Sequence, residues 1–591
     1  MRYPRLRELQ SSRQMVEVFK GYNHNLRIGD GEFYDMKNMT SDYYPVLSPR
    51  GKRGVYASPA SPKGMIAKDA LCYVDGTEFV MNEYRIDMGL NDEPKQLISM
   101  GAYVIIMPDK KWINTLNTTE FGNIEAEVIT ESPVSFTLCK LDGTDYSSDI
   151  PTDEPAEPSN MDLWVDVSTE PHSLKQWSES SSMWVTIPTT YVKIYSPGSG
   201  LGTAFEKYDG ITITGLSGAL HDNVSGNIIE DSSDLAALEG AAVVWEKGDD
   251  YIVVVGVLDV TRTITEQITI SRKMPIMDFI VESGNRLFGC RYGENADGEV
   301  VNEIYATKLG DFKNWNCYMG LSTDSYAASC GTDGQFTGAI THMGYPLFFK
   351  ENCVHKVYGN YPANFQIQDT ACRGVQKGCE KSLAIVNETL FYKARSGVCA
   401  YDGSLPTEVS YVFGNEAYSE AVGGSHGNKY YISMKDADEA WNLFVYDIAK
   451  GMWHKEDDIK VDQFCSCRGE MYAISDGQII TMLGSGTPDA NLVEWMVETG
   501  EIGITSPDMK YISRITIRMS MDIDAEVGIY AQYDFSEEWE CQCVLRSTNL
   551  RSFSIPIRPK RCDHMKLRIE GVGNVKIYSI TKTIEQGSEL S

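Results

Sequence analysis

The chain has 591 residues, too many for a single hydrophobic core and enough for three or four domains. Apolar residues make up 42% of it, as in ordinary globular proteins, and the formal net charge is −30. Because phosphate binding needs a basic surface, this charge excludes a protein that binds nucleic acid through charge neutralisation.

The first 54 residues predict an extended N-terminal arm. Residues 1–20 carry five basic side chains against two acidic ones, a local charge of +3 on an otherwise acidic chain. Such a segment is either a solvated tail or a docking arm that finds an acidic neighbour. The candidate partner-docking residues are Arg2, Arg5, Arg7 and Arg13. The segment has no apolar signal sequence and the chain has no apolar run of bilayer length, so we expect no membrane partner.

A repeated pattern of short strands occupies residues 55–116 and, after an interruption, 270–485. Each unit opens with a turn residue and an apolar run rich in Val, Ile, Tyr and Phe, which is typical of all-β proteins. The last three openings lie roughly 41 residues apart, within the range of four-stranded propeller blades. The units open at Asp69, Gly101, Asn285, Gly344, Asn387, Asn428 and Gly469. We expect a β-propeller of six or seven blades whose two chain ends share a blade.

Residues 117–269 interrupt the repeat and predict an inserted β domain. Strand-like runs lie on both sides of an acidic stretch, 141–182, which is rich in Pro and Ser. That stretch contains ten acidic residues and one basic residue, Lys175. Its composition predicts a long, exposed and weakly packed loop.

Residues 486–591 predict a separate C-terminal module. In one segment Ile515, Ile517, Met519 and Met521 alternate with polar residues, the pattern of a strand with one buried face. Four further strand-like runs follow it. A β-sandwich of the jelly-roll type is the expected closure.

The sequence offers no pattern for a metal, a cofactor or a catalytic group. The eight histidines are scattered, and the pairs Cys465/Cys467 and Cys541/Cys543 have no second pair at zinc-site spacing. We interpret the cysteines as small core residues with reduced thiols. Three tryptophans could line a sugar cleft, although in blade repeats such residues are more often core: Trp315, Trp441 and Trp453. We therefore expect no metal, no cofactor and no enzymatic activity.

Several segments together resemble a family of tailed-bacteriophage proteins. They include Gly31–Met39, Tyr44–Arg50, Asn285–Cys290, Gly310–Trp315 and Gly397–Gly403. The order of these strands and turns is similar to that of packaged-DNA stabilisation and tail-nozzle proteins of short-tailed phages. The resemblance covers about residues 18–115 and 270–485.

This resemblance implies a structural virion protein, assembled in the host bacterial cytoplasm and located in the phage tail. Several copies, most simply six, would form a ring at the head–tail axis below the portal and adaptor. The ring would extend the DNA channel and retain the packaged genome until ejection. An acidic channel wall agrees with that role, because it would let DNA pass without binding it.

Two other functions stay open at this point. One is a receptor-binding or carbohydrate-binding tail component, in which the insert and the C-terminal sandwich would carry recognition. The other is a polysaccharide-degrading enzyme built on a propeller, which would need a catalytic pair of carboxylates. Glycan binding by the isolated C-terminal module would favour the first, and loss of activity on substituting one carboxylate pair would favour the second.

Overall fold

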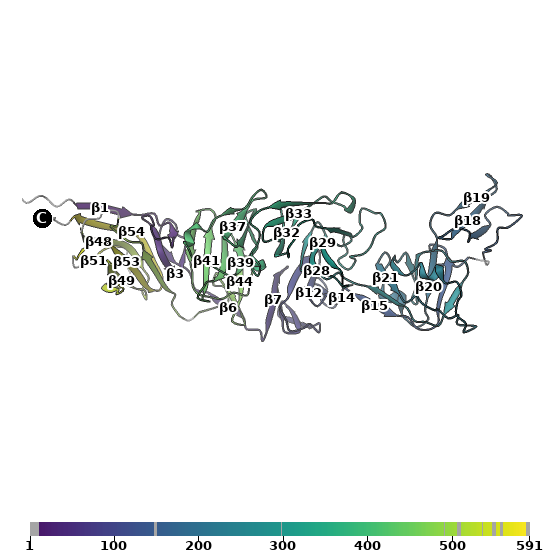
Figure 1. Ribbon diagram of the computed structural model, residues 1–591. Helices are drawn as coiled ribbons and strands as arrows, with labels where there is room; N and C mark the ends of the chain where they lie inside the picture. Colours follow the sequence, from purple (N-terminus) through teal and green to yellow (C-terminus); the bar gives the residue numbers. More distant parts are fainter. Residues whose placement is uncertain are drawn as a thin grey trace, which may run out of the picture.

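The computed structural model shows an elongated and almost entirely β-stranded protein (Figure 1). Three parts follow one another along its long axis: a two-sheet module, a central group of sheets, and an inserted module (Figure 1). The structure describes residues 11–146, 150–296, 298–489, 491–504, 510–534, 536–546, 551–555 and 560–586. The α-helices in these ranges are α1 (Leu201–Ala204) and α2 (Ser233–Ala236), and no helix in them has the length and apolarity to cross a membrane.

Seven antiparallel sheets make up the central part of the described chain. Six of them contain four consecutive strands, and we number these sheets from one to six. The first sheet contains β7 (Pro62–Ala67), β8 (Leu71–Asp75), β9 (Glu78–Met81) and β10 (Tyr84–Asp87), and the second contains β11 (Gln96–Met100), β12 (Tyr103–Met107), β13 (Lys111–Asn114) and β14 (Phe121–Asn123). The third contains β27 (Phe279–Ser283), β28 (Arg286–Glu294), β29 (Val300–Ala306) and β30 (Tyr326–Ser329), and the fourth contains β31 (Gly338–His342), β32 (Tyr345–Lys350), β33 (Cys353–Tyr358) and β34 (Gln366–Ala371). The fifth contains β35 (Ala384–Val386), β36 (Thr389–Ala394), β37 (Gly397–Tyr401) and β38 (Thr407–Glu408), and the sixth contains β39 (Glu420–His426), β40 (Lys429–Lys435), β41 (Trp441–Asp447) and β42 (Met452–Lys455).

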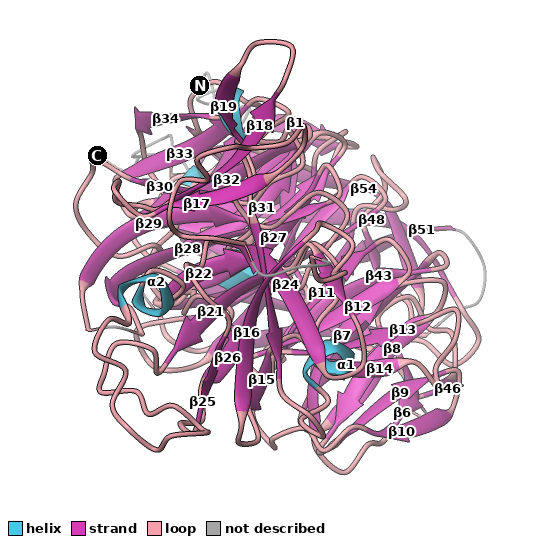
Figure 2. Cartoon of the chain, turned by 90° about the vertical axis from the view of Figure 1, so that its right-hand side faces the viewer, coloured by secondary structure: helices cyan, strands magenta, loops and turns pink. Residues whose placement is uncertain are grey.

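The seventh sheet joins strands from two distant parts of the chain. Residues 463–488 supply β43 (Gln463–Cys467), β44 (Glu470–Ser475), β45 (Gln478–Thr481) and β46 (Thr487–Pro488). The strand β6 (Gly54–Ala57), which precedes the first sheet in sequence, pairs with β45 and β46. Viewed along the long axis, the labelled strands of the first four sheets and of the seventh lie around a common centre (Figure 2), and β43 of the seventh sheet contacts β7 of the first.

Tight turns between the first two strands of several sheets explain the repeated openings in the sequence. Two successive residues have positive φ in these turns, as in Gly284–Asn285 (58° and 61°) and Asn387–Glu388 (46° and 71°). This is the conformation of a two-residue hairpin turn whose twist matches that of the strands, and Gly and Asn tolerate it best. The sequence signal at Asn285 and Asn387 therefore has a direct geometric cause.

The two-sheet module contains strands from both ends of the chain. One sheet has the strands β1 (Ser11–Val16), β54 (Val575–Gln586), β48 (Lys510–Met521), β51 (Arg551–Ile555) and β52 (Arg561–Cys562). The other has β2 (Gly21–Tyr22), β3 (Glu32–Lys37), β47 (Glu494–Thr499), β53 (Met565–Val572), β49 (Glu526–Tyr533) and β50 (Glu540–Leu545). We call this module the sandwich, because side chains of both sheets share one buried cluster.

The expectation of an extended arm over residues 1–54 needs correction for its described part. Strand β1 pairs with β54, and β3 pairs with β47, so residues 11–37 belong to the sandwich. The next residues, with β4 (Met39–Thr40) and β5 (Ser48–Pro49), connect the sandwich to the central sheets. The cause is non-local strand pairing between the two ends of the chain, which composition and turn signals do not encode.

The connection between the sandwich and the central sheets is well packed. Arg50 and Arg53 form ion pairs with Glu456 and Asp457 of the segment after β42, with Arg53 reaching both carboxylates at 2.7 Å. One apolar cluster also continues from sandwich residues such as Trp495 to central residues such as Trp453. The sandwich and the central sheets therefore share one continuous hydrophobic core.

The inserted module has two sheets of its own around a separate apolar core. One sheet contains β15 (Ala126–Ile129), β26 (Thr269–Arg272), β21 (Gly210–Thr214) and β22 (Gly240–Val243). The other contains β23 (Glu246–Lys247), β24 (Tyr251–Val255), β20 (Tyr191–Tyr195), β16 (Val134–Cys139) and β25 (Arg262–Ile264). Its strands span residues 126–272 rather than 117–269, because β14 completes the second central sheet.

The acidic stretch 141–182 is not the continuous loop that its composition predicts. It contains β17 (Leu163–Asp166) and β18 (Ser173–Ser178), which form a three-stranded sheet with β19 (Met183–Thr186). Val165 and Leu174, on neighbouring strands, are 0% and 1% exposed. Their alternation with polar residues supplies a buried face, and this local pattern outweighs the high content of acidic residues.

Candidate functional site

The three-stranded sheet β17–β18–β19, which we call the tip sheet, lies at the end of the molecule opposite the sandwich (Figure 1). Two local features form it. The carboxylate of Asp166 accepts hydrogen bonds from the backbone N and the hydroxyl of Ser168, at 3.0 and 2.6 Å, and so turns the chain after β17. The left-handed residue Ser182, with φ of 51°, closes the hairpin between β18 and β19.

The register of the tip sheet places three tryptophans on one face. Trp177 on β18 lies directly opposite Trp184 on β19. On the other side of β18, Trp164 lies opposite Lys175, which is two residues from Trp177 and therefore points to the same face. The sheet thus has one face of indole rings, which we call the indole face, and one face of aliphatic side chains.

The ring of Trp184 contacts the rings of both other tryptophans. The ring centres of Trp164 and Trp184 are 5.4 Å apart with an interplanar angle of 62°, and those of Trp184 and Trp177 are 5.4 Å apart at 67°. All three side chains are half-buried. Trp164 Nε1 donates to Thr152 O at 3.0 Å, whereas the N–H groups of the other two rings have no acceptor in the described protein and are not enclosed.

A charged pair adjoins these rings. Lys175 Nζ lies 2.5 Å from Asp166 Oδ2 and 4.9 Å from the centre of the Trp164 ring, so the ammonium group contacts both a carboxylate and an aromatic face. Hydrogen bonds from Lys175 and Ser168 lower the pKa of Asp166 to about 2. This carboxylate is therefore ionised at neutral pH, and its hydrogen bonds to Ser168 and Lys175 hold the edge of the indole face in place.

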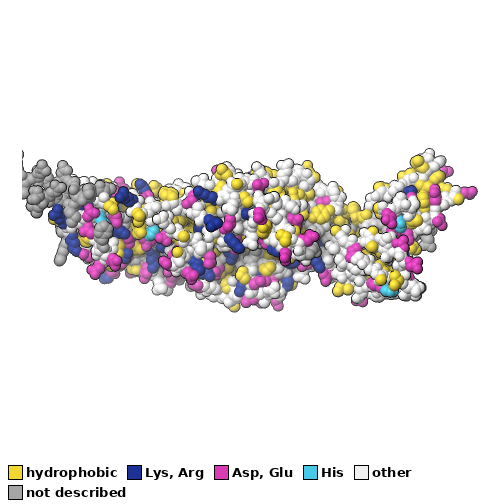
Figure 3. Space-filling model, in the orientation of Figure 1, with side chains coloured by type: hydrophobic (Ala, Val, Ile, Leu, Met, Phe, Trp, Pro, Cys, Tyr) yellow, Lys and Arg dark blue, Asp and Glu magenta, His cyan; other side chains and the backbone are white. Residues whose placement is uncertain are grey.

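The aliphatic face of the tip sheet is also open to solvent at its outer end. Met183 and Val185 are 55% and 48% exposed, and Figure 3 shows hydrophobic side chains gathered over this end of the molecule. Large aromatic and aliphatic side chains that remain exposed together on a soluble protein usually mark an interaction site.

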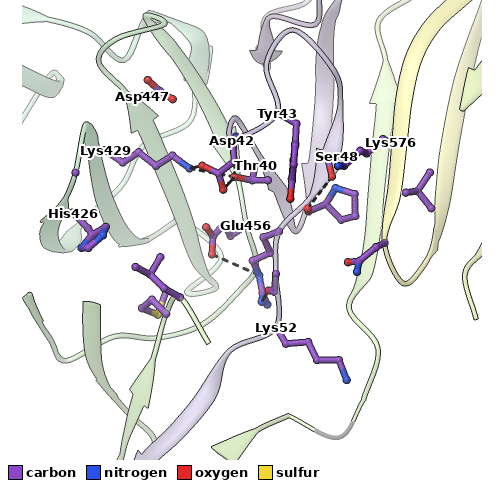
Figure 4. Close-up of a pocket in the computed structure, with 18 of the residues that line it drawn as sticks. Thr40, Asp42, Tyr43, Ser48, Lys52, His426, Lys429, Asp447, Glu456 and Lys576 are labelled. Atoms are coloured by element: carbon purple, nitrogen blue, oxygen red, sulfur yellow. Dashed lines mark hydrogen bonds and ion pairs between the residues drawn. The ribbon is translucent and has the colours of Figure 1, made fainter. Parts of the chain in front are cut away.

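A second candidate is a cavity of about 790 Å³ where the connecting segment, the sixth and seventh central sheets and the sandwich meet (Figure 4). Its charged side chains are largely paired with each other. Lys429 binds Asp42 at 2.6 Å, Lys450 binds Asp447 at 2.7 Å, and Lys576 lies 4.0 Å from the centre of the Tyr43 ring. The balance of charge leaves no clear preference for an anion or a cation, so we interpret this cavity as a polar joint between modules.

The predicted docking arginines are only partly within the described residues. Arg2, Arg5 and Arg7 lie outside them. Arg13 is on the edge strand β1, where its side chain is exposed and its backbone pairs with Thr583.

The other residues singled out in the sequence mostly pack in cores. Trp315 and Trp453 are 1% and 2% exposed, and Trp441 is half-buried on β41. Cys467 is buried in an apolar cluster, and Cys465 packs against that cluster. Within the described ranges, no three His, Cys, Asp or Glu side chains are grouped so that they could hold a metal ion.

Sequence reasoning missed the indole face. Its signal was present: Leu163-Trp164-Val165 and Trp184-Val185-Thr186 are short apolar runs within or beside the acidic stretch. The first run lies inside the stretch whose acidic residues predicted a loop, and a composition average over forty residues cannot resolve a strand of four. The second is one of the strand-like runs expected beside that stretch, but its sequence does not reveal the register that places its tryptophan.

No family model and no curated protein match the chain. Among solved structures it is similar to an exo-β-1,3-galactanase from Phanerochaete chrysosporium, with 8% identity over 51% of this chain and 95% of that chain, and a TM-score of 0.20. A glycoside hydrolase family 43 arabinoxylan arabinofuranohydrolase from Bacillus subtilis has 9% identity over 51% and 94% of the two chains, and a TM-score of 0.15. Trypanosoma rangeli sialidase has 9% identity over 97% and 96%, and a TM-score of 0.15.

These neighbours correct one expectation from the sequence. We expected no enzymatic activity, and that expectation is withdrawn, because the similar solved structures are glycoside hydrolases and a sialidase. At these TM-scores the likeness assigns none of their activities to this chain.

Proposed function

We propose that this protein is a receptor-binding component of a phage tail, attached through its sandwich end and binding through its tip sheet. The observation that carries the proposal is the position of the indole face. It lies at one extremity of the molecule, whereas the first and last described strands, β1 and β54, pair with each other at the opposite extremity (Figure 1). An elongated protein with its first and last described strands at one pole and an exposed aromatic surface at the other suits attachment to a larger particle and contact with a distant ligand.

The chemistry of the tip supports contact with a partner rather than a purely internal role. Tryptophan combines a large apolar surface with an N–H donor, and such residues dominate the energy of many interfaces. Three of them in mutual contact, with two donors left open, form a surface that a monomeric protein gains little by exposing to water.

Antibody fragments provide the test. A Fab that recognises residues 161–187 should block adsorption of virions carrying this protein to their host cells, and it should label the outer end of the tail. A Fab against the exposed sandwich strand β50 serves as the control for steric effects. Adsorption that continues unchanged with the tip fully covered by Fab would refute a receptor-binding role for this surface.

We also infer that the seven central sheets are the blades of one closed β-propeller. Contact between β43 and β7 would close the ring, with β6 completing the last blade. Side chains bridge every junction between successive sheets. The hydrogen bonds are Lys68 to Ser99, Gln96 to Ile280, Ser283 to Gly344, His342 with Glu388, Tyr430 to Ser382, Ser466 to Ser425, and Gln463 with Met65.

A second candidate function is the ring-forming tail component implied by the sequence resemblance. The feature that favours it is the edge strand β1, which has a paired neighbour, β54, on one side only among the described strands. A free edge can pair with a strand of a second copy, and a head-to-tail contact that closes makes a ring. Native mass spectrometry of the purified protein tests this: a single closed stoichiometry supports a ring, and a monomer at every concentration contradicts it.

A further inference from the structure

We propose that the indole face of the tip sheet binds an uncharged polysaccharide; this inference rests on the receptor-binding function proposed above. The reasoning starts from the shape of the surface. Trp184 contacts both Trp164 and Trp177, with ring centres 5.4 Å apart in each pair, and the three residues come from three neighbouring strands. A surface that spans three strands can contact more than one unit of an extended ligand.

Sugar rings suit this surface because they have the same mixed character. A pyranose presents C–H groups on its faces and hydroxyls around its rim. The faces can pack on indole rings, and the hydroxyls can accept from the open N–H groups of Trp177 and Trp184. Lys175 beside the rings adds an ammonium donor, and the exposed residue Thr186 lies opposite Lys175.

The charge around the tip excludes anionic ligands. Residues 150–187 contain seven acidic side chains and a single lysine, a net charge of −6 without His172. The lysine is already paired with Asp166. A sulfated or phosphate-rich polymer would be repelled, and so would an anionic membrane, which requires a basic surface.

The ring geometry also disfavours a quaternary ammonium ligand. An aromatic cage holds such a cation between rings that stand apart, with the cation within about 6 Å of each ring centre. Here the rings touch one another edge to face, so no space for a trimethylammonium group separates them. The ammonium of Lys175 already covers Trp164. An uncharged sugar chain is the ligand class that meets all these constraints.

The experiment uses the full-length protein on an array of neutral and anionic polysaccharides, with phosphatidylcholine vesicles as a separate probe for choline groups. We expect binding to one or more neutral glycans, with little change between low and high salt. Trp184→Ala, which removes the central ring, should weaken that binding at least about tenfold. Trp441→Ala is the matched control, because Trp441 is a half-buried tryptophan on a central sheet, and it should leave binding unchanged.

The outcomes separate this inference from the proposed function. Binding only to anionic glycans or to vesicles, binding to none of the probes, or equal binding by Trp184→Ala and the parent protein would overturn the ligand class. If the tip Fab nevertheless blocks adsorption, the receptor-binding function stands with a ligand of another class. If a neutral glycan binds through Trp184 while the Fab leaves adsorption unchanged, the ligand class stands and the receptor-binding function fails. Circular dichroism of each variant confirms that it is folded.

Discussion

Asp209 and Arg272 form a buried ion pair at the base of the inserted module, where both side chains are less than 10% exposed. Arg272 also donates to Ile124 O, at 3.1 and 3.2 Å, at the start of the insert. Asp209 in turn accepts from Asn314 Nδ2 at 2.8 Å, and Asn314 belongs to the third central sheet's long loop. The ion pair of Asp209 and Arg272 therefore joins both ends of the insert to the central part.

Removing this carboxylate should destabilise the protein. Asp209→Leu leaves the guanidinium of Arg272 buried without its counter-charge, and we expect a loss of about 3–5 kcal/mol in the free energy of unfolding. Scanning calorimetry would show this loss as a lower temperature of the first unfolding transition. The double variant Asp209→Leu/Arg272→Met should recover much of the loss. As a control, Glu246→Ala removes the more exposed pair with Lys207 and should cost less than about 1 kcal/mol. An unchanged transition in Asp209→Leu would contradict this role.

Closure of the central sheets gives a second prediction. The side-chain amide of Gln463 accepts from Met65 N at 2.9 Å and donates to Met65 O at 2.8 Å, which ties the seventh sheet to the first. Gln463→Leu leaves these backbone groups unpaired beside the buried Met65, so we expect a loss of about 1–3 kcal/mol. Urea denaturation of this variant and of Gln478→Leu, an exposed position in the same sheet, measures the difference. Equal midpoints would mean that apolar packing alone closes the ring.

His454 should make stability depend on pH. Its ring is buried, neither nitrogen has a hydrogen-bond partner among the described residues, and burial together with Lys429 lowers its pKa to about 3. In the unfolded chain this histidine binds a proton near pH 6.5, whereas in the folded protein it stays neutral at that pH. The neutral ring therefore makes its full contribution to the free energy of unfolding above pH 6.5. That contribution is lost as the pH falls toward 3, by up to about 1.4 kcal/mol per pH unit.

The variant His454→Phe isolates this effect. Between pH 6.5 and 4.5 the parent protein should lose more stability than the variant, since carboxylates titrate in both. Asp42, Asp447, Lys429 and Lys450 are the charged groups around the ring and are the same in both proteins. His426→Gln, at the rim of the nearby cavity, is the control. If stability fell equally with pH in all three proteins, His454 would take up its proton as easily in the folded protein as in the unfolded chain.

The N-terminal arginines remain a prediction about assembly. Replacing Arg2, Arg5, Arg7 and Arg13 together by Ser should reduce incorporation into virions without lowering the unfolding temperature. For Arg13 the structure explains why the unfolding temperature should not fall: its side chain is exposed on β1, and backbone pairing with β54 holds the strand. Arg551→Ser, on β51 at the far edge of the same sheet, is the control. Normal incorporation of the arginine variant would exclude a docking role for these residues.

Local patterns in the sequence were sufficient to predict much of the secondary structure. Ile515, Ile517, Met519 and Met521 are at most 4% exposed, as their alternation with polar residues predicts. Asn285 and Asn387 occupy hairpin turns because their side chains tolerate a positive φ. In each case a few adjacent residues determine the conformation, so a short window of sequence is informative.

Features that depend on distant residues could not be predicted in this way. Ser11 pairs with Glu585, and no periodicity links positions so far apart in the chain. The indole face depends on the register between β17, β18 and β19, which sets Trp177 opposite Trp184. A slip of one residue would move these side chains to opposite faces, and composition contains no information about register.

The pairing of β1 with β54 has a practical consequence for engineering. Since the first and last described strands are neighbours, a short peptide bridge can join the start of β1 to the end of β54, and new ends can be opened at the exposed turn Glu179–Ser182. Such a circular permutant would keep every strand of the central sheets continuous. It would carry a genetically fused reporter or enzyme directly at the pole of the tip sheet, far from β1 and β54.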